Sequence, residues 1–450
     1  MAKDEEGRGI LREEEHSSSL VAALDVKKDT TFANTKWKLP PSKSHLIRMM
    51  YLCALSKKIH TLSGVTSVGE DPESMARCLG QLGVKITVEK DTLIIQGQGI
   101  HELIRPTAAL NAGNSGTALR FLMGLASRTK FPIALDGDAS LRRRDHQDLL
   151  DSLKSLGVKC SSEIENKRLP FLLQGPWNKY DMKVNTSKSS QPYSSLLLAT
   201  EGINQSCTIE RSSNSVSKRH AQLTMDLMSE CGAVIEMDGS KVIVQPWEST
   251  PPKRWEVPSD ASMLAFTALS CIVANREITV SNLPSKEDSI GHEVLLDMLP
   301  EIGLRLNQNN LVPSEMYSKV DINLVDANDL LPPLSAILAL TGGGTISGAP
   351  HAMFKESNRI DKTAEMLHQF GIDSIIKEDG ITIKGNQSIQ KPVSMIQTFG
   401  DHRLQMTAII LATKVGAIVE GTHLHQIADP NFLERLSTMP AEVFVKRVQG

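Results

Sequence analysis

Two acidic side chains in the second half of the sequence have the chemistry of proton-transfer groups. Asp329 stands directly before the run LLPP, and Glu356 lies between basic residues in the segment FKESNRID. A carboxylate can take or give a proton when neighbouring groups set its pKa. The spacing of Lys355 and Arg359 predicts that they share a helix face, with Glu356 turned aside. Taken alone, this segment is more typical of a solvated salt-bridge surface.

Hydroxyl and basic residues stand at a predicted strand-to-helix junction near the start of the chain. In LPPSKSHLIRMM, two prolines end a short strand, and Ser42 or Ser44 can cap the helix that follows. The free amides at the start of that helix, with Lys43 and Arg48 close by, suit an anion such as phosphate or carboxylate. An ordinary helix cap with two solvated cations would have the same sequence.

Similar polar groups precede predicted helices along the rest of the chain. Some contain glycine, which allows close backbone approach to a ligand, and others contain arginine, which can grip a carboxylate through two hydrogen bonds. Because these groups occur in both halves of the chain, together they fit two anionic ligands bound in a cleft, with Asp329 and Glu356 as proton carriers. The groups are residues 114–117, 142–144, 187–191, 217–220 and 401–403.

The composition limits the classes of partner. A net charge of −3 gives no global reason to expect nucleic acid or an anionic membrane, and 4% aromatic residues argue against a base-stacking surface. No apolar run approaches the length of a membrane span. The six cysteines are scattered without metal-ligand spacing, so we expect reduced thiols in a cytoplasmic protein and no metal site.

One pattern recurs along the chain. A helical stretch ends in a glycine, and a short strand, a turn and an apolar strand follow, at intervals of about 70 residues. This length suits a unit of the βαβαββ type, and glycine suits the left-handed turn that ends the helix. A sixth, degenerate copy is expected near residues 401–436. The glycines that mark the other copies are Gly83, Gly157, Gly232, Gly303 and Gly371.

The repeats predict an α/β fold of two similar domains, each of three βαβαββ-type units. The proline-rich segment 248–260 marks one crossing between the domains, and a second crossing is expected near residues 40–41. The predicted division is a first domain over 42–253 and a second over 35–41 plus 254–450. Residues 1–34 are expected to form a flexible polar tail, or a loosely docked helix around residues 20–24.

Taken together, the quoted segments resemble the 5-enolpyruvylshikimate 3-phosphate (EPSP) synthase family of enolpyruvyl transferases. The likeness runs from about residue 36 to 436, and FKESNRI with DHR is specific in combination. DLLPPLSA is similar to archaeal members. The matching segments, in the order of the family, are PSKSHLIR, GNSGTALR, RRRDHQDL, SKSSQ, SVSKRH, DLLPPLSA, FKESNRI and FGDHRLQM.

The resemblance implies two three-unit domains with the active site in the cleft between them. It implies transfer of the enolpyruvyl group of phosphoenolpyruvate to the 5-hydroxyl of shikimate 3-phosphate, with release of phosphate, in the shikimate pathway of aromatic amino-acid biosynthesis. It also implies a cytoplasmic monomer that needs no metal or organic cofactor.

The resemblance implies a role for each matching residue. Asp329 takes the 5-hydroxyl proton and Glu356 protonates the methylene carbon, while Lys43, Lys355 and His402 assist as catalytic neighbours. The residues implied for shikimate 3-phosphate are Lys43, Ser44, Arg48, Ser189, Ser190, Gln191, Ser217, Asp329 and Lys355. Those implied for phosphoenolpyruvate are Lys43, Asn114, Gly116, Thr117, Arg144, Gln191, Arg359 and Arg403.

The sequence departs from the family pattern at a few places. Ile427 stands where the family usually has a lysine, and losing a cation there should weaken phosphoenolpyruvate binding by about 1.5–3 kcal/mol. His351, Ala352 and Met353 replace the usual neighbours before the Lys-Glu pair, and His220 stands where some members carry tyrosine.

Other functions share part of this pattern. One is a paralogous enolpyruvyl transferase or shikimate-phosphate-processing enzyme with a different acceptor. A non-catalytic phosphometabolite-binding protein is disfavoured because both Asp329 and Glu356 are retained. A UDP-N-acetylglucosamine enolpyruvyl transferase is disfavoured because residues 142–146 contain no cysteine. An RNA-end-processing enzyme is disfavoured by the lack of a basic, aromatic groove.

Overall fold

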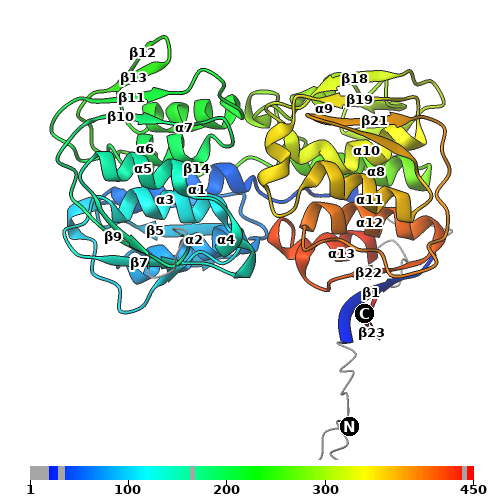
Figure 1. The fold of residues 1–450 in the computed structure, drawn as a ribbon, viewed down its shortest axis with the longest axis horizontal. Coiled ribbons are helices and arrows are strands. Elements are labelled where there is room, and N and C mark those ends of the chain that lie inside the picture. Colours follow the sequence, from blue (N-terminus) through cyan, green and yellow to red (C-terminus); the bar gives the residue numbers. More distant parts are fainter. Residues whose placement is uncertain (1–19, 29–35, 163–167, 438–442, 450) are drawn as a thin grey trace, which may run out of the picture.

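The computed structural model describes residues 20–28, 36–162, 168–437 and 443–449. These residues form two lobes that lie side by side, one from each half of the sequence (Figure 1). Each lobe has its own cluster of buried apolar side chains. Within the described ranges, no helix combines the length and the apolarity needed to cross a membrane.

Every four-stranded sheet in the described residues is built to one plan. In the fifth unit, β18 (Val320–Asn323) pairs in parallel with β19 (Gly343–Ser347), the strand that follows the helix. β19 then pairs antiparallel with β21 (Gly380–Lys384), the second strand of a hairpin with β20 (Ser374–Lys377). The same order recurs in the other four-stranded sheets, which confirms the predicted α/β fold of βαβαββ-type repeats.

The remaining four-stranded sheets use strands from both lobes. In the first lobe these are β3 (Ile59–Ser63), β4 (Lys85–Glu89), β5 (Thr92–Gln96), β6 (Leu110–Asn111), β7 (Ile133–Asp136), β8 (Lys159–Ser162), β9 (Phe171–Gln174), β10 (Asp181–Val184), β11 (Cys207–Arg211), β12 (Ile235–Asp238), β13 (Lys241–Val244) and β14 (Arg254–Glu256). In the second lobe they are β2 (Lys36–Trp37), β15 (Ile278–Val280), β16 (Leu304–Asn307) and β17 (Asn310–Pro313).

One helix of each unit lies at the centre of its lobe and packs on the central helices of the neighbouring units. Such helices are apolar nearly all round, as α12 illustrates by burying every residue from His402 to Thr413. The central helices are α1 (Lys43–Leu55), α3 (Gly116–Ala126), α6 (Gln191–Leu198), α8 (Leu264–Ala274), α10 (Leu331–Leu340) and α12 (His402–Val415).

The other helices accompany the central ones. Those of at least nine residues, such as α11, bury one face and expose charged residues on the other. They are α2 (Glu70–Gln81), α5 (Gln147–Ser155), α7 (Lys218–Glu230) and α11 (Arg359–Gln369), with the shorter α4 (Ala139–Arg143), α9 (Glu293–Asp297) and α13 (Phe432–Ser437).

The glycines that mark the repeats all have positive φ angles, from 72° at Gly371 to 98° at Gly83. A side chain is disfavoured in this left-handed region, so glycine is the residue that lets the chain leave the helix and enter the hairpin. The prediction that these glycines end helices is confirmed.

The sixth unit is completed by both ends of the chain. Its sheet contains β22 (Ala417–Glu420), β1 (Leu20–Val26) and β23 (Val443–Gln449), with β1 in the middle (Figure 1). The helix expected around residues 20–24 is therefore wrong, and so is that part of the expected tail. An isolated parallel bridge from Ile396 to Val419 takes the place of the first strand. The rest of the expected tail lies outside the described residues, except 27–28.

The chain crosses between the lobes twice, and the crossings are bonded to each other. β2 pairs with β15 of the second lobe, and α1 then enters the first lobe. Ser42 N donates to Pro258 O (2.7 Å), and Asp260 N donates to Pro40 O (2.8 Å). β14 pairs with β3 of the first lobe, so the expected boundary at 253/254 falls too early. We propose that the lobes are two domains divided at 40–42 and 257–260.

Candidate active site

A cavity of about 370 Å³ lies between the two lobes. From the first lobe it is lined by Lys43, Gly116 and Gln191, the first residues of α1, α3 and α6. From the second lobe it is lined by residues of η4 (Asn328–Leu330), which precedes α10, and by His402 at the start of α12. Helix N-termini that converge on one space favour negative charge there.

Most of the predicted site residues line this cavity, whereas Asn114 and Arg403 lie behind its wall. Asn114 Oδ1 accepts a hydrogen bond from Arg144 Nη2 (2.8 Å), and Arg403 Nη2 donates to Asp329 Oδ2 (3.0 Å). The predicted residues that line the cavity are Lys43, Ser44, Arg48, Gly116, Thr117, Arg144, Ser189, Ser190, Gln191, Ser217, Asp329, Lys355, Glu356, Arg359 and His402.

Asp329 lies between two buried arginines. Its Oδ1 is 2.5 Å from Arg359 Nη1, and its Oδ2 is 3.0 Å from Arg403 Nη2. Burial by itself would raise the pKa of Asp329, but Arg403, Arg359, Lys355 and Lys43 hold it well below the ordinary value. With the cavity empty, Asp329 is therefore ionised and a weak base.

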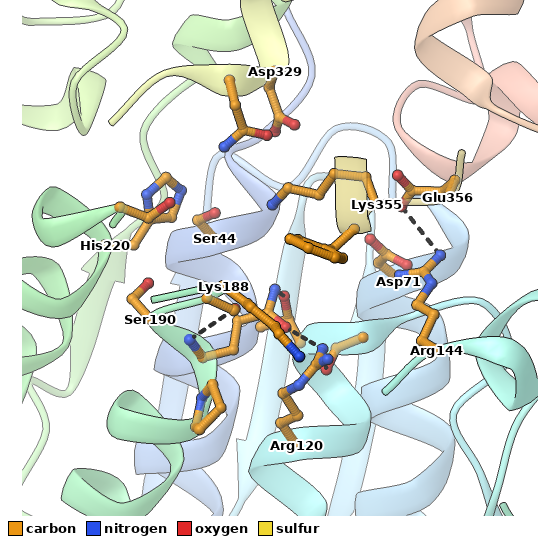
Figure 2. A pocket seen from close by; sticks show the side chains of 18 of the residues that line it. Ser44, Asp71, Arg120, Arg144, Lys188, Ser190, His220, Asp329, Lys355 and Glu356 are labelled. Carbon is orange, nitrogen blue, oxygen red and sulfur yellow. Dashed lines mark hydrogen bonds and ion pairs between the residues drawn. The ribbon is translucent and has the colours of Figure 1, made fainter. Parts of the chain in front are cut away.

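Glu356 joins the two lobes. Its Oε2 is 2.6 Å from Arg359 Nη2, and its Oε1 is 3.3 Å from Arg144 Nη2 on the opposite wall (Figure 2). Burial would raise its pKa, but Arg359 and Arg144 hold it well below the ordinary value. The prediction that Glu356 turns aside from a helix face shared by Lys355 and Arg359 is wrong, because α11 begins only at Arg359.

Asp401 fixes the position of Arg359. It is fully buried, its Oδ2 accepts from Arg359 Nε (2.8 Å), and its Oδ1 accepts from the backbone of Arg403 (2.9 Å) as the cap of α12. The sequence analysis placed Asp401 at a helix start but gave it no role. The segment DHR held the signal, since an acidic residue before a helix is a common cap.

The two lysines of the site differ in environment. Lys43 Nζ is 3.0 Å from Asp71 Oδ2. Burial lowers the pKa of Lys43, but Asp71 and, more weakly, Asp329 raise it above the ordinary value. Lys355 has no such close partner within the described residues, and burial lowers its pKa to about 8. Lys355 is thus the cation of this site most easily deprotonated near neutral pH.

The wall from the first lobe is a chain of hydrogen bonds. Arg120 Nη1 donates to Gln191 Oε1 (2.6 Å), and Gln191 Nε2 donates to Thr117 Oγ1 (2.8 Å). A Cβ at Gly116 would lie 2.8 Å from Arg120 Nη1 and 3.2 Å from Arg144 Nη1. The sequence analysis missed Arg120, although it stands four residues after Gly116 in GNSGTALR, where the two share a helix face.

Arg48 is buried beneath the serine-lined part of the cavity. Its Nε donates to Thr224 Oγ1 (2.8 Å), and its Nη groups donate to the carbonyls of Ser44 (2.8 Å) and His220 (3.2 Å). Burial lowers its pKa to about 9. Arg48 thus ties the start of α1 to the start of α7, and none of the described carboxylates forms an ion pair with it.

The residues that depart from the family pattern occupy different places. His220 and Met353 line the cavity, while His351 lies behind it, its Nε2 2.9 Å from Asn328 Nδ2. Ile427 is buried and is not among the described residues that line the cavity. Its carbonyl would lie 2.6 Å from a Cβ at Gly69, so the two lobes are in close contact there.

One group in the described residues has metal-like spacing, formed by Glu356, Asp401 and His402. Arg359 already donates to both of these carboxylates. Burial, together with Lys43, lowers the pKa of His402 well below its ordinary value. The group therefore fits an arginine-centred network better than a metal site.

The whole chain is similar to known proteins. The family model described as EPSP synthase (3-phosphoshikimate 1-carboxyvinyltransferase) matches residues 30–436. A 3-phosphoshikimate 1-carboxyvinyltransferase of Methanosarcina mazei is 31% identical over 90% of this chain and 95% of that protein. One of Methanosphaera stadtmanae is 29% identical over 90% and 96%. These relatives are archaeal, as the segment DLLPPLSA indicated.

Two solved structures share the fold. EPSP synthase from Acinetobacter baumannii has a TM-score of 0.75 and 23% identity, and the match covers 95% of this chain and all of that one. The enolpyruvyl transferase NikO from Streptomyces tendae has a TM-score of 0.73 and 14% identity over 95% of this chain and all of that one. At these identities the likeness supports the fold alone.

Proposed function

The chain belongs to the EPSP synthase family, and we propose how the residues of its cleft carry out the reaction of that family. The enzyme transfers the enolpyruvyl group of phosphoenolpyruvate to the 5-hydroxyl of shikimate 3-phosphate and releases phosphate. The observation that carries the proposal is the pair of buried carboxylates, Asp329 and Glu356, held by arginines on opposite sides of one cavity.

Phosphoenolpyruvate binds among the arginines. Its phosphate and carboxylate match the guanidinium groups of Arg144 and Arg359, with Arg120 beside them and Arg403 behind. Lys43 reaches the same space from the start of α1. Shikimate 3-phosphate binds on the serine side, where Ser44, Ser189, Ser190 and Ser217 offer hydroxyl groups and Lys355 offers a cation.

Phosphoenolpyruvate changes the basicity of both carboxylates. In the empty cleft, Arg359 bonds Asp329 and Glu356 together, and Arg144 bonds Glu356. When the anions of phosphoenolpyruvate engage these guanidinium groups, the carboxylates lose part of their stabilisation and their pKa values rise. Glu356 can then hold a proton, and Asp329 becomes a stronger base.

The proton transfers follow from these positions. The 5-hydroxyl attacks C2 of phosphoenolpyruvate and gives its proton to Asp329, while Glu356 protonates the methylene carbon to form a methyl group. In the second stage the tetrahedral intermediate expels phosphate, and Glu356 takes a proton back from that methyl group. No net proton is lost at Glu356, so it returns to its starting state.

Contacts between the lobes keep water from the reacting carbons. Arg144 bonds Glu356 across the cleft, and Lys188 Nζ lies 5.5 Å from the centre of the Phe354 ring. Water excluded in this way cannot compete with the 5-hydroxyl for C2. We also infer a monomer, since all of these cavity walls come from one chain, and a cytoplasmic location, since the six cysteines are unpaired.

The test is release of inorganic phosphate from purified protein given phosphoenolpyruvate and shikimate 3-phosphate, with each omitted in turn. Release that needs both substrates, with a product mass equal to the enolpyruvyl ether, is the expected result. Binding of phosphoenolpyruvate without release would mean that the enzyme uses a different acceptor, and absence of both would refute the proposal.

A further inference from the structure

Three buried polar atoms without hydrogen-bond partners among the described residues belong to neighbouring parts of the cavity wall. They are Nδ1 of His220, Nε2 of His292 and Oδ1 of Asn328. Leaving such an atom unpaired costs about 1–3 kcal/mol. Atoms of this kind are uncommon in folded proteins. Their gathering in a ligand cavity indicates that a ligand completes their hydrogen bonds.

Bonds between the lobes hold this part of the wall together. Ser217 N at the start of α7 donates to Val325 O of the second lobe (3.1 Å), and Arg219 Nη2 lies 3.0 Å from Glu293 Oε1 of α9. These bonds flank His220 on one side and His292 on the other. The two segments therefore meet where the serine side of the cavity reaches the second lobe.

The rings of His220 and His292, here called the imidazole pair, face each other across the lobe boundary. Their centroids are 6.2 Å apart and their planes are at 77°. His220 belongs to α7 of the first lobe, and His292 immediately precedes α9 of the second. The pair can form only when the lobes are in contact, so its state is linked to closure.

The tautomer of His292 follows from its neighbour. Nδ1 is 2.9 Å from the carbonyl of Ser289, and a carbonyl can only accept, so Nδ1 carries the hydrogen. In the neutral ring Nε2 therefore holds a lone pair. It can accept a hydrogen bond from a ligand hydroxyl or, once protonated, donate one to a phosphate oxygen.

The surroundings keep His220 neutral while the cavity is empty. Burial, with contributions from Arg48 and His292, lowers the pKa of His220 well below its ordinary value. A phosphate dianion close to the pair would act in the opposite direction and favour a protonated ring. The charged groups around the pair are Arg48, Arg219, Glu293, Asp326, Asp329 and Lys355.

We propose that His292 is an acceptor-binding residue, and that the imidazole pair takes up a proton when a phosphorylated acceptor enters the cleft. The proposal rests on the function proposed above, which places the acceptor on the serine side. It goes further in assigning His292 a direct contact with the acceptor and in linking that contact to proton uptake.

The experiment is calorimetric titration of the intact protein with shikimate 3-phosphate near pH 6.5, in two buffers of different ionisation enthalpy. At this pH Lys355 is charged and does not contribute, since its pKa is about 8. The unmodified protein should take up a large fraction of about one proton per acceptor bound. The phosphate of the ligand titrates equally in every variant, so differences between variants isolate the pair.

Two variants of His292 separate hydrogen bonding from charge. His292→Gln keeps a polar group near the place of Nε2 but cannot be protonated, so proton uptake should fall by at least half with a small loss of affinity. His292→Phe keeps the size but neither property, so affinity should fall about tenfold or more, since bonds to charged groups contribute about 1.5–3 kcal/mol. His368→Gln, whose histidine side chain is 79% exposed on α11, is the control.

The outcomes are distinct. Acceptor binding by the unmodified protein, with affinity and proton uptake unchanged in both His292 variants, would overturn the inference and leave the proposed function standing. Absence of acceptor binding by the unmodified protein would overturn the proposed function and the inference with it. A Phe variant that loses structure by circular dichroism would be set aside, and the Gln variant would then decide through proton uptake.

Discussion

The two walls of the cleft balance their charges in different ways. On the first-lobe wall, Arg120 bonds Gln191 and Arg48 bonds Thr224, so these cations are held by neutral partners. On the second-lobe wall, Arg359 touches three carboxylates, those of Asp329, Glu356 and Asp401. Lys43, paired with Asp71, is an exception on the first-lobe wall.

This difference divides the work between the lobes. A cation held by neutral partners keeps its charge available to an incoming anion, so the first-lobe wall is suited to binding. A carboxylate held by arginines has a pKa that depends on those arginines, so the second-lobe wall is suited to proton transfer that begins when substrate engages them. Glu356, bonded to Arg144 across the cleft, is where the two walls meet.

The largest expected effect breaks the proton function of the second-lobe wall. Glu356→Gln should lower kcat by about 10²–10⁴-fold, the usual contribution of a general acid or base, while both substrates still bind. Phosphate release measures kcat, and calorimetry measures binding. Glu365→Gln on the outer face of α11, where the carboxylate pairs with Lys362, is the matched control. Turnover close to that of the control would refute the role of Glu356.

The next effect tests the support of that wall. Asp401→Asn should weaken the hold on Arg359, lowering both kcat and the free energy of unfolding, the latter by about 1.5–3 kcal/mol for bonds to a charged group. Urea denaturation with activity assays on the same samples measures both, and exposed Asp373→Asn is the control. Unchanged stability and kcat would show that Arg359 is positioned without Asp401.

A smaller effect is expected on the first-lobe wall. In Gly116→Ala the new methyl would crowd Arg120 and Arg144, at 2.8 and 3.2 Å from their Nη1 atoms. KM for phosphoenolpyruvate should rise about tenfold, equivalent to about 1.4 kcal/mol, while kcat changes little. Gly80→Ala is the control, because a Cβ there meets no atom within 4 Å. A loss confined to kcat would contradict the division between walls.

The pH dependence of acceptor binding should give an effect of a few fold. The pKa of Lys355 is lowered to about 8, so Lys355 is charged below that pH and loses its charge as the pH rises through it. KM for shikimate 3-phosphate should therefore increase between about pH 7 and pH 9, above the range in which the imidazole pair acts. Lys355→Met should remove the step, and a step that persists in this variant would assign it to another group.

The smallest effect concerns Ile427. Its side chain is buried and lies outside the described lining of the cavity, so Ile427→Lys should change KM for phosphoenolpyruvate by less than about threefold. A gain of tenfold or more would show that a lysine at this position reaches the substrate. In that case the missing cation limits this enzyme, as the family pattern suggested.

Much of the architecture could be predicted from local sequence signals. The glycine at the end of each repeat helix needs positive φ, so its spacing revealed the units. Hydroxyl caps such as Ser42 and Ser115 revealed where central helices begin. The place of β1 could not be predicted, because its partners β22 and β23 lie at the far end of the chain.

The charge partners within the site were harder to predict. The sequence indicated Asp329, Glu356 and Arg359 as separate groups, but not that Arg359 bonds both carboxylates and Asp401 as well. Arg120 and His292 have no pattern that distinguishes them from surface residues. Such pairings join segments far apart in the chain, so they become visible only when the lobes are in place.

Proton transfer at the second-lobe wall can be observed most directly with solvent deuterium. If Glu356 protonates the methylene carbon and later removes a proton from the methyl group, turnover in heavy water should place deuterium in the enolpyruvyl group of the product. Mass spectrometry should find this label with the unmodified enzyme and almost none in the slow product of Glu356→Gln. Equal labelling of the two products would contradict the account, because another group would then protonate that carbon.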